Sequence, residues 1–104
     1  MLHISPIAPI ELSLIMKSKG YDNSDMLQVL NALNDIIRRY TKPRYPQLRL
    51  EHVIYAMELM AKYEKLTFFD SIHASIAILN NLVYYDLNDV VKTVVNEEVK
   101  EFYK

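Results

Sequence analysis

Apolar side chains recur along this chain at the spacing of an α-helix. The clearest stripe consists of Met26, Leu30, Leu33, Ile37 and Tyr40. Successive members lie three or four residues apart, so they share one face of a helix expected from about Ser24 to Tyr40. An earlier helix can begin at Pro6 or at Pro9, and Pro9 is favoured for its regular part, because a proline inside the helix would remove a hydrogen bond. This helix is expected to stop by Gly20, which leaves only a short turn before the next. Helices joined so closely are expected to form an antiparallel hairpin.

Two further helices are expected after a loop over residues 41–49, which contains two prolines. One covers about Glu51 to Lys65, and the next follows Thr67 and ends at Asn80-Asn81. Thr67 is a suitable N-cap, and Asp70 stands three residues on, where a capping box requires an acid.

Short apolar runs outside these helices are interpreted as strands. They lie at residues 2–5, 82–85 and 93–95, with another considered at 47–50. Residues 86–92 are expected to form one or two helical turns, and residues 95–104 a terminal helix or tail. This mixture favours an α/β fold. An all-helical bundle stays open as the alternative, and a structure without parallel strands near Ile4 and Val83 would indicate it.

Length and composition indicate one folded domain over residues 1–104, with 51% hydrophobic and 24% charged residues. The absence of cysteine excludes a disulfide framework, thiolate metal ligands and a cysteine nucleophile. The single glycine, Gly20, excludes a P-loop and a GxGxxG dinucleotide loop. The net charge is −1 and no long apolar run is present, so we expect a cytoplasmic protein without a membrane partner.

Three carboxylates near element boundaries, Glu11, Asp70 and Asp86, are the candidates for catalysis. Each also has a structural interpretation. A helix N-terminus favours Glu11, a capping box accounts for Asp70, and Asp86 can open a turn. The carboxyl end of a strand in an open α/β sheet is a usual place for ligand and metal sites. Carboxylates brought together there would predict a divalent-cation site.

The run from Leu66 to Asp86, LTFFDSIHASIAILNNLVYYD, resembles the C-terminal half of a PIN domain, the nuclease fold of VapC-like toxins and RNA-processing proteins. In that family a serine or threonine precedes an aspartate by three residues, and a small-residue helix, an apolar strand and a second aspartate follow. The matching residues are Thr67, Asp70, His73, Ala74, Ala77, Val83 and Asp86. Upstream, ISPIAPIELSLIM resembles the family's second strand and the helix with its acidic residue, here Glu11.

The resemblance implies a mostly helical, three-layer α/β/α fold with a short parallel sheet. It also implies a Mg²⁺- or Mn²⁺-dependent endoribonuclease, such as the toxin of a toxin–antitoxin pair. By transfer of the motif, Asp70 and Asp86 would be metal ligands, and Glu11 a ligand or a group acting on a metal-bound water. Asn88 would contribute a neutral oxygen. The implied partners are an RNA substrate and an antitoxin-like protein.

The chain departs from the family at its start, where relatives have a first strand ending in an aspartate that binds the metal. No acid precedes Glu11. Met1 is then an internal methionine of a longer protein, or the chain is a truncated inactive copy, or a partner supplies the strand. Exposed strand edges would favour a homo-oligomer. The alternative function is a non-catalytic PIN remnant that acts as a protein-interaction or dimerisation module.

A cluster of basic residues follows the second expected helix. Its members are Arg38, Arg39, Lys42, Arg44 and Arg49, with Tyr40 and Tyr45 among them. Cations interleaved with aromatic rings predict a strip that binds single-stranded RNA, and a solvated loop is the alternative.

Overall fold

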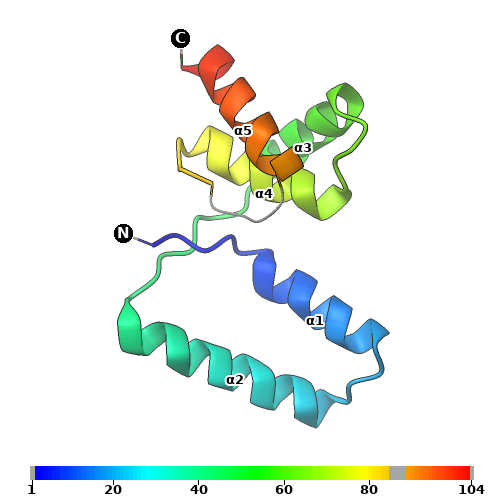
Figure 1. Ribbon diagram of the computed structural model, residues 1–104, viewed down its shortest axis with the longest axis vertical. Coiled ribbons are helices and arrows are strands. Elements are labelled where there is room, and N and C mark those ends of the chain that lie inside the picture. Colours follow the sequence, from blue (N-terminus) through cyan, green and yellow to red (C-terminus); the bar gives the residue numbers. More distant parts are fainter. Residues whose placement is uncertain (1, 85–88, 104) are drawn as a thin grey trace. The chain divides into compact units, whose positions relative to one another are not determined.

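The computed structural model describes residues 2–84 and 89–103, and within these ranges it contains five α-helices and no strand (Figure 1). The helices are α1 (Ala8–Ser18), α2 (Asn23–Tyr40), α3 (Leu50–Lys62), α4 (Phe68–Leu79) and α5 (Asp89–Phe102). They fall into two compact units, Met1–Pro46 and Gln47–Lys104. Whether the two units unfold together as the expected single domain stays a prediction.

The N-terminal unit is a helical hairpin in which α1 and α2 run in opposite directions (Figure 1). Gly20, at a φ of 89°, ends α1, because its N–H donates to the Lys17 carbonyl and the Tyr21 N–H donates to the Met16 carbonyl. This Schellman motif requires the left-handed conformation that glycine adopts without strain. The Asp22 carboxylate then accepts a 2.8 Å hydrogen bond from the Asp25 N–H and starts α2. The predicted hairpin is therefore confirmed.

A backbone bridge joins the segment before α1 to the segment after α2. His3 and Arg44 pair in the parallel sense, with the Ile4 N–H donating to the Arg44 carbonyl at 2.8 Å. The Arg44 N–H donates in turn to the Leu2 carbonyl at 2.9 Å. The strand expected at residues 2–5 is thus a single isolated bridge.

The C-terminal unit is organised around α4, which packs against both α3 and α5. Three side chains on α4, Ser71, Ala74 and Ser75, are completely buried and small, so they allow neighbouring segments to approach closely. The core of the unit is apolar and consists of Leu59, Leu66, Ala74, Ala77, Ile78, Val91, Val94 and Val95. At the far end of α5, the Tyr103 hydroxyl donates to the Ile78 carbonyl at 2.6 Å.

The prediction of an α/β fold with a three-layer α/β/α arrangement is wrong, because every regular element among the described residues is a helix. Leu82 does not begin a strand, since its N–H donates to the Ala77 carbonyl as part of the cap that ends α4. Residues 93–95 lie within α5, where Val91, Val94 and Val95 are buried at helical spacing. Burial of that stripe outweighs the β-propensity of valine. Residues 47–49 form no strand, and α3 begins directly afterwards at Leu50.

The same finding overturns the resemblance to a PIN domain, whose central parallel sheet has no counterpart in the described residues. The all-helical alternative is the class that the structure supports. In residues 2–84 and 89–103, moreover, no helix combines the length and apolar character needed to cross a membrane.

Candidate functional site

The predicted carboxylate site is only partly within the described residues. Glu11 lies in the first turn of α1, in the N-terminal unit, and Asp70 lies in the first turn of α4, in the C-terminal unit. Asp86 and Asn88 lie outside the described residues. In the part of the chain that is described, no three histidine or carboxylate side chains are grouped so that they could hold a metal ion.

Asp70 forms a capping box with Thr67 at the start of α4. The Thr67 hydroxyl oxygen accepts from the Asp70 N–H at 3.2 Å, and the Asp70 carboxylate accepts from the Thr67 N–H at 3.4 Å. This pairing satisfies two backbone N–H groups at the start of the helix. The capping role predicted for the two side chains is confirmed.

We expect Thr67→Ala to lower the free energy of unfolding by about 1 kcal/mol, because α4 loses an N-cap. Urea titration followed by circular dichroism measures the loss, and an unchanged midpoint would contradict the capping role. The same titrations with Mn²⁺ test Asp70 as a metal ligand. A stabilisation by Mn²⁺ that Thr67→Ala keeps and Asp70→Asn removes would support that role.

A buried carboxylate that the sequence did not single out connects α5 to α3. Glu98 is 7% exposed, and its carboxylate accepts hydrogen bonds from the Tyr55 hydroxyl at 3.1 Å and the Tyr63 hydroxyl at 2.8 Å. The Lys62 ammonium donates a third at 2.6 Å. The carboxylate is therefore neutralised and its lone pairs are satisfied, as burial of a charge requires.

The protonation states in this network are set by burial and by the hydrogen bonds. Burial acts to raise the pKa of Glu98, but donation from Lys62, Tyr63 and Tyr55 outweighs it, and the pKa is lower than usual. Burial and the neighbouring Glu98 carboxylate raise the pKa of both tyrosine hydroxyls, which stay protonated and donate. Every group thus holds its partner in place, which is the arrangement of a structural ion pair.

A visible signal could have identified Glu98. The buried stripe of α5 runs through Val91, Val94 and Val95, and the next inward position at helical spacing is residue 98. An acid at that position requires a buried cation or hydroxyl partner.

The buried side chain of His52 and the exposed side chain of Asn80 lie close together between two helices. The His52 Nδ1 accepts from the Arg49 N–H at 2.9 Å and satisfies the start of α3. Its Nε2 lies 3.3 Å from the Asn80 Nδ2, and this amide nitrogen donates to the Ile76 carbonyl at 2.8 Å. His52 therefore caps the first turn of α3 and lies against the end of α4, so its role is structural.

The basic strip is divided between the two units. Arg38 and Arg39 occupy the last turn of α2, and Lys42 and Arg44 follow in exposed positions. Arg49 belongs to the C-terminal unit, where its guanidinium lies 3.8 Å from the Glu51 carboxylate. Binding of RNA by these side chains stays a prediction.

The N-terminal hairpin exposes much of its apolar surface. The side chains of Val29, Leu33, Ile36 and Tyr40, hereafter the α2 seam, are between 39% and 85% exposed. They follow one another at intervals of four, three and four residues, the repeat of a helix–helix contact. None of the 18 residues of α2, all of which the structure describes, is buried.

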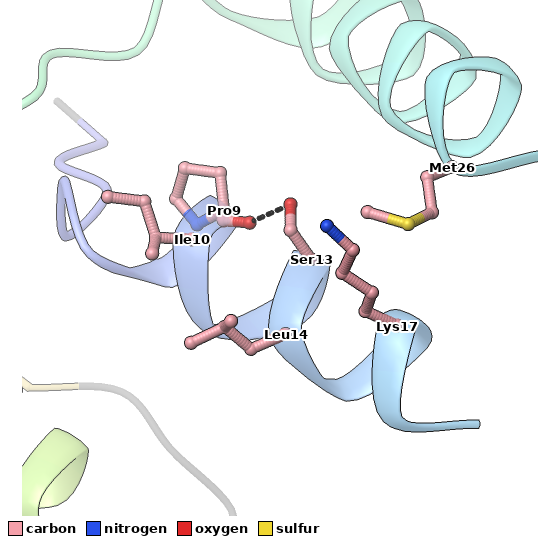
Figure 2. Close-up of a pocket in the computed structure, with 6 residues that line it drawn as sticks. All are labelled: Pro9, Ile10, Ser13, Leu14, Lys17 and Met26. Carbon is pink, nitrogen blue, oxygen red and sulfur yellow. Dashed lines mark hydrogen bonds between the residues drawn. The ribbon is translucent and has the colours of Figure 1, made fainter. Parts of the chain in front are cut away.

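A groove with a volume of about 310 Å³ lies along α1 at the start of α2 (Figure 2). Pro9, Ile10, Leu14 and Met26 supply its apolar lining, and the Lys17 side chain places its ammonium between Ser13 and Met26 (Figure 2). The only hydroxyl in the lining, that of Ser13, donates to the Pro9 carbonyl at 2.7 Å. The groove therefore offers apolar contact and one positive charge, the chemistry of a docking surface.

The chain matches no protein-family model, no curated protein and no solved structure. Over the described residues, the fold identifies the chain only as an all-α protein. It consists of a two-helix hairpin with exposed apolar side chains and a unit of three helices.

Proposed function

We propose that this chain is a protein-interaction module that binds an amphipathic helix through the exposed apolar surface of its N-terminal hairpin. One observation carries the proposal. The helix α2 has 18 residues and a clear apolar stripe, yet none of its 18 residues is buried. Most helices in proteins gain their stability by packing an apolar face against another element. A partner that covers the α2 seam would supply that packing.

The groove on α1 supports the same proposal. Ile10 and Leu14 are both about half exposed, and they extend the apolar surface from α2 onto its neighbour. Apolar side chains one turn apart are what a docking helix contacts when it lies along a groove. The C-terminal unit, by contrast, has an apolar core of its own and a buried carboxylate whose hydrogen bonds lie within the unit.

This proposal keeps the interaction module that the sequence left as the alternative, without its derivation from a PIN domain. Metal-dependent cleavage of RNA loses the fold on which it was based. Glu11, Asp70, Asp86 and Asn88 as catalytic groups, with Mg²⁺ or Mn²⁺ as cofactor, stay predictions from the sequence.

We expect selection of random peptides on phage against the immobilised full chain to enrich peptides with apolar residues three and four positions apart. Ile36→Asp should abolish their binding, because it places a charge in the α2 seam. Ile54→Asp is the matched control, since Ile54 lies on α3 and is 53% exposed, the same fraction as Ile36. Enrichment of no peptide, or binding that survives Ile36→Asp, would contradict the proposal.

A further inference from the structure

We infer that the partner of the α2 seam is the α2 seam of a second copy of this chain, packed in the antiparallel direction. The inference rests on the proposed function and names its partner. Two helices whose apolar residues repeat at alternating intervals of three and four pack along that seam. The seam from Val29 to Tyr40 has this repeat and contains no polar residue at its own positions.

The charges of α2 select a second copy as the partner and select its direction. Asp22 and Asp25 stand at the N-terminal end of the helix, and Arg38 and Arg39 stand in its last turn. In an antiparallel pair the acidic end of each helix lies beside the basic end of the other, twice by symmetry. A parallel pair would place acids beside acids and arginines beside arginines, which opposes association.

The symmetry also fixes which seam residues meet. Pairing of Asp25 with the second copy's Arg39 places the two-fold axis beside Ala32, midway along the helix. Leu33, close to this axis, then approaches its own counterpart. Val29 on one helix lies near Ile36 on the other, because these two residues stand about one helical turn on opposite sides of the axis. Each of these positions is apolar and more than a third exposed in the single chain.

Pairs with small interfaces associate weakly, so the test uses a high protein concentration. Sedimentation equilibrium of the full chain at about 100 µM is expected to give the mass of a dimer. Ile36→Asp should give a monomer, and Ile54→Asp should leave the dimer intact, since both side chains are 53% exposed but only Ile36 lies in the seam. A monomer at this concentration for the unsubstituted chain overturns the inference. If phage selection still enriches helical peptides, the proposed function survives; if it does not, both fail.

Disulfide trapping tests the direction, and the chain has no cysteine of its own to interfere. An oxidised mixture of Val29→Cys and Ile36→Cys chains should yield the mixed disulfide at several times the level of either like pair. Like pairs in excess would indicate parallel helices and overturn the antiparallel arrangement. Ile54→Cys measures the background from random collision, and a mixed disulfide no stronger than this background also overturns the inference.

Discussion

Replacing Glu98 by alanine is expected to lower the free energy of unfolding of the C-terminal unit by about 2–4 kcal/mol. The substitution leaves the hydroxyls of Tyr55 and Tyr63 and the ammonium of Lys62 without their common acceptor. The two tyrosine hydroxyls bear most of the cost, because they are partly buried, whereas the Lys62 side chain is exposed and recovers water. Urea titration followed by circular dichroism at neutral pH measures the loss.

Glu97 provides the matched control, because it is the adjacent acid of the same helix and is exposed. Its carboxylate accepts a long hydrogen bond of 3.4 Å from the Tyr63 hydroxyl at an exposed position, so Glu97→Ala should change stability by less than about 0.5 kcal/mol. Equal losses of stability in Glu98→Ala and Glu97→Ala would show that the buried hydrogen bonds of Glu98 do not stabilise the fold.

The same network should make the free energy of unfolding depend on pH in the acidic range. The carboxyl of Glu98 titrates at 4.5 when unperturbed and at a lower pH in the folded chain. Its contribution is therefore complete above pH 4.5 and is lost as the pH falls through the folded pKa, where the unfolded chain binds the extra proton. In Glu98→Gln this part of the acid dependence should disappear, while Glu97→Gln should keep it.

Replacement of one isoleucine by alanine is expected to have very different costs in the two units. Ile78 is fully buried on α4. Ile78→Ala should therefore lower the free energy of unfolding by about 2–5 kcal/mol, because it removes apolar contact and leaves a cavity in the core. Ile36 is 53% exposed on α2. Ile36→Ala should lower the free energy of unfolding by less than about 1 kcal/mol, since little contact is lost and alanine favours the helix.

Denaturant titration of both variants at low protein concentration checks this difference. A loss at Ile36 as large as that at Ile78 would mean that the α2 seam is already covered within a single chain. The proposed function would then have no free surface on which to act.

The sequence predicted the helices well where the signal was local. The stripe through Met26, Leu30 and Leu33 marks α2, and Thr67 and Asn80 mark the two ends of α4. The strands were predicted wrongly because short apolar runs do not distinguish a strand from a helix end or a buried helix face. Residues 93–95 illustrate this, since three β-branched residues in a row lie inside α5.

The motif that suggested the candidate site has a local structural explanation. Thr67 and Asp70 match the nuclease motif, but the same two side chains at the same spacing form an ordinary capping box. Helical spacing marks residue 98 as an inward position, but the partners of Glu98 could not be predicted, because Tyr55 and Lys62 lie 43 and 36 residues away and only the folded chain brings them together.

The two caps of α4 have a consequence for the order in which the chain assembles. Thr67 and Asp70 close its start, and Asn81, in the left-handed conformation with a φ of 51°, closes its end with Leu82. All of these bonds lie within a segment of neighbouring residues, so they form without the entropy cost of closing a long loop. We therefore expect α4 to form before α3 and α5 dock against it, and the bonds of Glu98, which join residues far apart in the sequence, to form last.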